Sequence, residues 1–304
     1  MAGSVQAFLR RLPLNHVHRI THRSLSTSSA QLRDISKYFH YNKAIVGNIP
    51  ASCVDKSLRF EEPEEPINLL RARQQHANYI KELKSLVGNV IQIPVDEEYP
   101  DMVFVEDPAV VIEGRALLTR MVRPSRAGEA RAMRTALERH NLEIVEMRDT
   151  GAYVDGGDVI FTGREILVGL SERTNSAGIS EVARAFPNWP VTAIKVKKGV
   201  LHLKSMSSMA GIDLIAIGDS DAGRHAWRDI ETKAHYKYKK LAFPDNNGAN
   251  CLFINGVVLH PPKEEYPKSF AVWETLDCPR IALPNSELAK ADGSLTCNSI
   301  RIHV

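Results

Sequence analysis

The chain has 304 residues, of which 43% are hydrophobic and 25% charged, and its formal net charge is +3 at pH 7. This size allows one large domain, or two small ones, with a sizeable buried core. No run approaches the roughly 18 apolar residues of a membrane span, so we expect no membrane segment. Residues 1–40 carry a net charge of +5 and the remainder −2. The remainder therefore lacks the basic excess of a nucleic-acid-binding face, and we expect no nucleic-acid partner.

The four cysteines show no spacing typical of a metal ribbon or a redox pair. They are Cys53, Cys251, Cys278 and Cys297, and none forms a C-x-x-C motif. Their low number in a chain of this length also disfavours a secreted disulfide framework, which indicates a reducing compartment.

The N-terminal segment differs in composition from the rest of the chain. Residues 1–33 contain five arginines and no acidic residue, and residues 24–29 are rich in serine and threonine. This composition is typical of an organelle transit peptide, so we expect a mitochondrial leader over 1–33 that is not part of the fold. The alternative is a disordered basic tail on a cytoplasmic protein.

Four stretches have the pattern of β-hairpins: residues 110–118, 159–168, 208–217 and 251–259. Their expected turn glycines at positions 114, 163, 211 and 256 are separated by 49, 48 and 45 residues. The pair Asn255-Gly256 is the strongest of these turn signals. Segments with helical spacing lie near 126–140, 177–186 and 222–235, with others near 67–87 and 285–290. A repeat of this length is typical of a radial array of similar units.

A fifth unit is divided between the two ends of the chain. Residues 43–46 and 300–304 both have strand-like patterns, and their pairing would close a ring of five units. Closure would also remove exposed sheet edges. We therefore predict a single α/β domain over about 40–304, with residues 50–60 as a candidate lid.

Polar residues recur at the same place in each repeat, just before its first strand. Asp101 and the pair Glu106-Asp107 precede the first hairpin, and Asp155-Gly156-Gly157-Asp158 precedes the second. His202 precedes the third, and Cys297 precedes the terminal strand. Taken singly these signals are weak, because a lone cysteine or a histidine between leucines is usually a packed interior residue. In a closed ring, however, equivalent ends of the repeats face one opening, where a thiol, an imidazole and carboxylates would meet.

These residues lie in motifs that resemble dimethylarginine dimethylaminohydrolase (dimethylargininase), of the guanidino-modifying enzyme superfamily. The motifs are residues 103–107, 155–165, 169–175, 202–205 and 295–297, and the resemblance runs from about residue 42 to 304. The fold that it implies is a five-bladed α/β propeller with pseudo-five-fold symmetry.

The resemblance implies hydrolysis of N-ω,N-ω-dimethyl-L-arginine, and of the monomethyl compound, to citrulline and an amine, which relieves inhibition of nitric oxide synthase. It makes Cys297 the nucleophile, His202 the proton donor and acceptor, and Asp155 the residue that orients His202. The implied substrate-contacting positions are Leu58, Asp101, Glu106, Asp107, Arg126, Arg173 and Ala291.

We expect no required cofactor, although Cys297 and His202 together would capture an inhibitory zinc ion. The expected partner is a small methylated arginine, and the sequence leaves open whether the protein is a monomer or a homodimer. Two alternatives remain at this stage. One is an arginine deiminase-type hydrolase, and the other is an inactive relative that acts as a binding protein.

Overall fold

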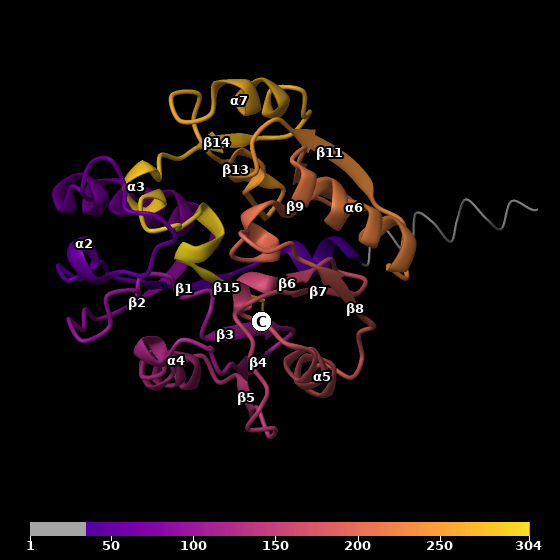
Figure 1. Ribbon diagram of the computed structural model, residues 1–304, viewed down its shortest axis with the longest axis horizontal. Coiled ribbons are helices and arrows are strands. Elements are labelled where there is room, and N and C mark those ends of the chain that lie inside the picture. The colour runs from indigo at the N-terminus through magenta and orange to yellow at the C-terminus, as the bar shows by residue number, and fades with distance from the viewer. Residues whose placement is uncertain (1–34, 304) are drawn as a thin grey trace, which may run out of the picture.

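The structure, a computed structural model, describes residues 35–303, so the expected leader lies outside the described residues. Five three-stranded sheets surround a central axis, and the longer helices lie on the outside of the ring (Figure 1). In each sheet the second strand pairs antiparallel with the first and is followed by a helix and a third strand that is parallel to it. A parallel return of this kind requires a crossover, which the helix provides. No helix in this part of the chain is long and apolar enough to span a membrane.

Four of the units are continuous in sequence. The first consists of β3 (Ala109–Ile112), β4 (Arg115–Leu118), α4 (Glu129–Glu138) and β5 (Glu143–Glu146). The second consists of β6 (Val159–Phe161), β7 (Ile166–Leu170), α5 (Ser176–Ala185) and β8 (Val191–Lys195). The third consists of β9 (Ser207–Gly211), β10 (Leu214–Gly218), α6 (Asp221–Lys233) and β11 (Lys239–Phe243). The fourth consists of β12 (Leu252–Ile254), β13 (Val257–His260), α7 (Pro267–Trp273) and β14 (Arg280–Ala282).

The fifth unit joins the two ends of the chain, as the sequence predicts. It consists of β15 (Ile300–Ile302), β1 (Lys43–Gly47), α3 (Leu69–Val87) and β2 (Asn89–Ile93). Strand β15 pairs antiparallel with β1, with Ile300 opposite Ile45, and β1 pairs parallel with β2. The prediction of a closed five-bladed α/β propeller is therefore confirmed. Packing begins before the predicted domain start at residue 40, because Ile35 and Phe39 are buried against the second and third units.

The hairpin turns follow the predicted chemistry in three units and differ in the third. In Glu113-Gly114 and Asn255-Gly256 both residues have positive φ, the backbone of a type I′ turn. In the third hairpin Gly211 is instead the last residue of β9, and Asp213 takes the positive φ of 55°. The turn lies beyond the predicted glycine because the short polar side chain of aspartate tolerates this conformation.

The expected helices correspond to α3, α4, α5, α6 and the short α8 (Ser286–Ala289). Asn68, Asn175 and Ser220 cap the first turns of α3, α5 and α6 by accepting hydrogen bonds from backbone N–H groups. Helix α7 has seven residues and was not predicted from the sequence. Its Trp273 is fully buried against Phe243, the last residue of β11 in the third unit.

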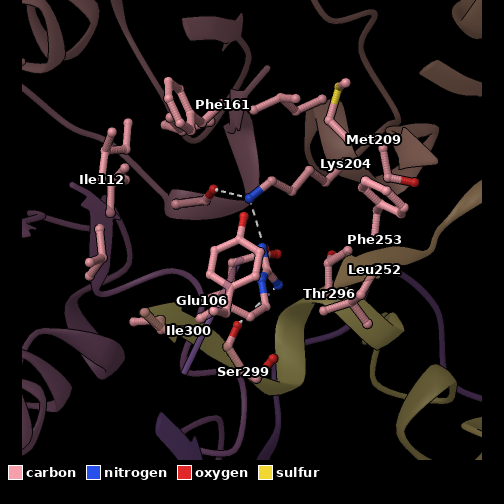
Figure 2. A pocket seen from close by; sticks show the side chains of 18 of the residues that line it. Glu106, Ile112, Phe161, Lys204, Met209, Leu252, Phe253, Thr296, Ser299 and Ile300 are labelled. Atoms are coloured by element: carbon pink, nitrogen blue, oxygen red, sulfur yellow. Dashed lines mark hydrogen bonds and ion pairs between the residues drawn. The ribbon is translucent and has the colours of Figure 1, made fainter. Parts of the chain in front are cut away.

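The first strands of the five units line an axial cavity of about 100 Å³ (Figure 2). Its wall includes Val110, Ile160, Met209, Leu252 and Ile300, one residue from each of these strands. Lys204 reaches across the cavity, where its Nζ donates to Glu106 Oε1 at 2.7 Å and to the Gly156 carbonyl at 3.1 Å (Figure 2).

Ring closure by β15 generates a first prediction. Ile302 is fully buried in this strand and lies opposite Lys43 of β1. We expect Ile302→Ala to lower the free energy of unfolding by about 2–5 kcal/mol, because it leaves a cavity at the junction of the two ends. Urea unfolding followed by circular dichroism measures this loss. Lys43→Ala, at the half-buried paired position, is the control and should cost less than about 1 kcal/mol. An equal loss in both variants would contradict a closing role for Ile302.

Candidate active site

A pocket of about 250 Å³ lies where the predicted site residues meet. Eight of the ten line it: Leu58, Asp101, Asp107, Arg126, Arg173, His202, Ala291 and Cys297. Of the other two, Asp155 is fully buried and hydrogen-bonded to His202. Glu106 faces the axial cavity and pairs with Lys204 (Figure 2).

Most of these side chains lie on segments that precede the first strands of the units, whereas Arg126 and Arg173 follow the second strands of theirs. Asp107 lies just before β3, and the short helix η3 (Gly156–Asp158) leads into β6. His202 caps η4 (Leu203–Ser205) before β9, and Cys297 lies in η6 (Leu295–Asn298) before β15. The ring therefore brings Asp107 and Cys297, which are 190 positions apart in sequence, to one pocket.

His202 is held by carboxylates. Its Nε2 donates to Asp155 Oδ2 at 3.0 Å and lies 3.9 Å from Asp107 Oδ1. Burial favours the neutral imidazole, but Asp107 and Asp155, with Asp158 nearby, outweigh it and raise the pKa of His202 to about 9. His202 is therefore protonated at neutral pH, so it can donate a proton to a leaving group.

Gly156 and Gly157 allow the backbone to approach the site closely. A Cβ on Gly157 would lie 2.5 Å from His202 Nδ1, and one on Gly156 would lie 2.0 Å from the Glu106 carbonyl oxygen. The Gly157 N–H also donates to Asp107 Oδ1 at 3.0 Å. Any side chain at these two positions would therefore displace the imidazole or the loop that carries Asp107.

Arg126 lies between two buried carboxylates. Its Nη1 donates to Asp107 Oδ2 at 2.6 Å, while Nε and Nη2 donate to Glu129 at 2.9 and 2.8 Å. Nη2 also donates to the Phe104 carbonyl at 3.1 Å. Four of the five guanidinium N–H groups are thus engaged, which leaves one for a ligand. Contact between Arg126 and substrate stays a prediction; in this structure its main role is to hold Asp107.

The electrostatic field around Cys297 disfavours its ionisation in the free protein. Burial raises the pKa of the Cys297 thiol, and the negative charges of Glu106 and Asp107 raise it further. The Ser294 N–H donates to the sulfur at 3.4 Å, and the Cys297 carbonyl accepts from the Glu106 N–H at 3.2 Å. Without a bound cation, Cys297 is a neutral thiol.

The candidate lid, residues 50–60, contains α2 (Cys53–Lys56), and its residues 58–60 line the pocket. The Leu58 N–H donates to the Asp101 carboxylate at 3.1 Å, and the Phe60 N–H donates to Asp292 Oδ2 at 2.7 Å. Two acidic side chains of the pocket therefore hold the lid segment. Sequence reasoning did not identify the lining residues Arg59, Phe60, Phe104, Arg123, Leu201, Asp292 and Gly293. Arg59, Phe60 and Asp292 could have been identified from the sequence because they follow the predicted site residues Leu58 and Ala291.

Potential metal ligands were compared within residues 35–303. One group of three has its ligand atoms within 4.8 Å of one another: Asp107, Asp155 and His202. Cys297 is not in that group, so an inhibitory zinc ion on Cys297 and His202 stays a prediction.

The raised pKa of His202 gives a testable pH dependence. Asp107→Asn should lower this pKa from about 9 towards the usual value of 6.5, because it removes a major opposing charge. The raised pKa also means that charge pairing of His202 stabilises the fold fully below about pH 6.5, and that this stability is lost as the pH rises through about 9. NMR titration of the histidine ring protons, assigned with a His202→Gln variant, measures the shift. Asp219→Asn, at an exposed position, is the control; an unchanged His202 pKa in Asp107→Asn would contradict the assignment.

Comparisons with known proteins agree with the fold and the motifs. The profile of the eukaryotic N,N dimethylarginine dimethylhydrolase family matches residues 43–222. The Homo sapiens protein DDAH2 is 34% identical over 239 residues, which cover 76% of this chain and 84% of that protein. N(G),N(G)-dimethylarginine dimethylaminohydrolase of Pseudomonas aeruginosa is 27% identical over 261 residues, which cover 85% of this chain and 99% of the relative.

A solved structure of the Pseudomonas aeruginosa enzyme, a cysteine-to-serine variant in complex with citrulline, is similar with a TM-score of 0.77. It covers 87% of this chain and 100% of the other, at 24% sequence identity, and so supports the fold. By the extent of the family match and the identity to its relatives, this chain belongs to the eukaryotic dimethylarginine dimethylaminohydrolase family.

Proposed function

We propose that this chain hydrolyses N-ω-methylated arginine to citrulline and methylamine or dimethylamine through a covalent intermediate on Cys297. The observation that carries the proposal is the pocket itself, in which Cys297 and His202 lie with carboxylates and arginines. Family membership supports the same reaction, because the Pseudomonas aeruginosa relative is named for it.

The charges of the pocket suit a substrate with a cation at one end and an amino acid group at the other. A guanidinium is always protonated in proteins, so it binds best beside carboxylates. Asp101 and Asp107 line the pocket that also contains Cys297. Arg173 and Arg123 line it too, and an arginine can hold a substrate carboxylate with two hydrogen bonds.

Substrate binding itself activates the nucleophile. Glu106 and Asp107 raise the pKa of Cys297, and His202 is already protonated, so no base in the free site removes the thiol proton. A bound guanidinium supplies the opposite charge that lowers the thiol pKa, and the thiol proton passes to solvent. Ionised Cys297 is therefore a minor species until the substrate binds.

The chemistry then proceeds in two steps. The Cys297 thiolate attacks the guanidinium carbon and forms a C–S bond, and the C–N bond to the methylated nitrogen breaks as His202 gives that nitrogen its proton. Neutral His202 next takes a proton from water, whose oxygen attacks the same carbon. The C–S bond breaks, the remaining proton of that water passes to solvent, citrulline forms and the thiolate is regenerated, so that two moderate barriers replace one high barrier. Asp155 holds the His202 ring in place through both steps.

Citrulline release by the full-length protein tests the proposal. We expect turnover of asymmetric dimethylarginine and monomethylarginine, and at least a roughly 10³-fold loss in Cys297→Ser and in His202→Ala, because the nucleophile and the proton donor are removed. Cys278→Ser is the matched control, since Cys278 lies outside the pocket, and should keep the wild-type rate. Turnover of unmethylated arginine alone would make the protein a deiminase. No turnover of any substrate by folded protein would identify a binding protein and refute the proposal.

We further propose that residues 1–33 direct the protein to mitochondria. The support is their composition, with five arginines and no acidic residue. A fluorescent protein fused behind residues 1–33 should enter mitochondria, and the same fusion with the five arginines replaced by glutamine should remain in the cytosol. A cytosolic location of the unchanged fusion would refute this address.

A further inference from the structure

A buried row of alternating charges runs from the start of α4 to the centre of the pocket. Glu129 contacts Arg126 at 2.8 Å, and Arg126 contacts Asp107 at 2.6 Å. Asp107 lies 3.9 Å from His202, which contacts Asp155 at 3.0 Å. Asp155 also lies 3.8 Å from Arg173. Of the residues in this row, Glu129 alone was not a candidate site residue from the sequence.

Glu129 does not line the pocket that contains Cys297. Its side chain is 3% exposed, and both of its carboxylate oxygens accept hydrogen bonds from Arg126. On its other side it lines a separate groove between α4 and the end of β2. Glu129 can therefore influence the reaction only through Arg126 or through the field of its charge.

The charge balance of the three residues shows what that influence is. Arg126 carries one positive charge and contacts two carboxylates, so the group Asp107, Arg126 and Glu129 has a net charge of −1. If Glu129 were neutral, Arg126 would balance Asp107 and the group would have no net charge. A cationic ligand beside Asp107 would then lose the attraction of one full charge in a dry site.

Burying the ion pair of Arg126 and Glu129 is costly for folding, since desolvation of each ion costs several kcal/mol. Burial also raises the pKa of Glu129, and the guanidinium of Arg126 opposes that rise. A stable fold alone would be served by a neutral group at this position. An unfavourable feature in an otherwise consistent fold is expected where function requires it.

We propose that Glu129 is a positioning residue for the reaction: it orients Arg126 and balances its charge, so that Asp107 remains available to the cationic guanidinium. This inference rests on the proposed function for its substrate. Glu129 would then affect substrate binding and the electrostatic potential at Cys297 although it contacts neither the substrate nor Cys297.

The test uses Glu129→Gln, which keeps the shape and removes the charge. We expect kcat/KM for asymmetric dimethylarginine to fall about tenfold, mostly through KM, because the cationic substrate loses the attraction of one buried negative charge. A second measurement compares alkylation of Cys297 by anionic iodoacetate and neutral iodoacetamide at one pH. The ratio of the two rates cancels the thiolate fraction and reports the local potential. It should rise roughly threefold or more, because the site becomes more positive.

Three further variants separate charge from structure. Arg126→Gln removes the positive charge and should lower the iodoacetate to iodoacetamide ratio below the wild-type value. If Glu129→Gln does not fold, this opposite change still tests the proposal. Glu129→Asp keeps the charge and should keep the ratio. Glu181→Gln is the matched control, because Glu181 pairs with Arg184 at the same i,i+3 spacing on α5, away from the pocket. Its kinetics and ratio should equal those of the wild type.

Failure of the role proposed for Glu129 can be distinguished from failure of the proposed function. A wild-type protein that releases no citrulline refutes the hydrolase, while the alkylation ratio still reports the charge effect at Cys297. An unchanged ratio in both Glu129→Gln and Arg126→Gln overturns the role of Glu129, even if turnover is normal. A rise of the same size in Glu181→Gln would also overturn it, because the effect would then not be specific to this pair.

Discussion

The pairing of β15 with β1 is the constraint on which the site depends. Ile300 opposite Ile45 fixes the terminal strand, and Cys297 lies only three residues before it. The Cys297 carbonyl then accepts a hydrogen bond from Glu106, a residue from the loop before the first complete unit. The nucleophile is therefore placed by the closure of the ring, and the rest of the site is placed by the units on either side.

The second organising feature is the concentration of acidic groups at one end of the axis. Asp101, Asp107, Asp155 and Asp158 are all buried there. Burial raises the pKa of Asp158 to about 6, and its carboxylate accepts from Ser171 Oγ at 2.6 Å and from the Leu203 N–H at 2.8 Å. Asp158 thus fixes the start of η4, next to His202. Through such contacts the carboxylates hold the imidazole in place and also set its charge.

Much of the fold was predictable from the sequence because its signals are local and repeated. Asn255-Gly256 specifies its turn within two residues, and the similar spacing of the hairpins indicates the ring. The third turn was misplaced because Gly211 and Asp213 are equally plausible from sequence, and only strand pairing distinguishes them. Helix α7 was missed because seven residues give too little periodicity, although Trp273 packs it against Phe243 of the third unit and His260 of its own unit.

The site was predictable to the extent that its residues occur in recognisable motifs. The pairing of Glu106 with Lys204 joins positions 98 residues apart, and no local pattern indicates it. The pair Arg126 and Glu129 has helical i,i+3 spacing, but sequence alone reads it as an ordinary surface pair. Its importance appears only when burial and the contact with Asp107 are known.

Adjacent residues in the segments just before β3 and β15 line two different spaces. Glu106 faces the axial cavity, whereas Asp107 lines the pocket; Thr296 lines the cavity, whereas Cys297 lines the pocket. The cavity side contains the ion pair of Glu106 with Lys204, so the negative charge of Glu106 is balanced away from the substrate. On the pocket side Asp107 is shared between Arg126 and His202. The segment that carries Glu106 and Asp107 thus places a balanced ion pair on the cavity side and an acidic side chain on the pocket side, where a cationic ligand adds the opposite charge.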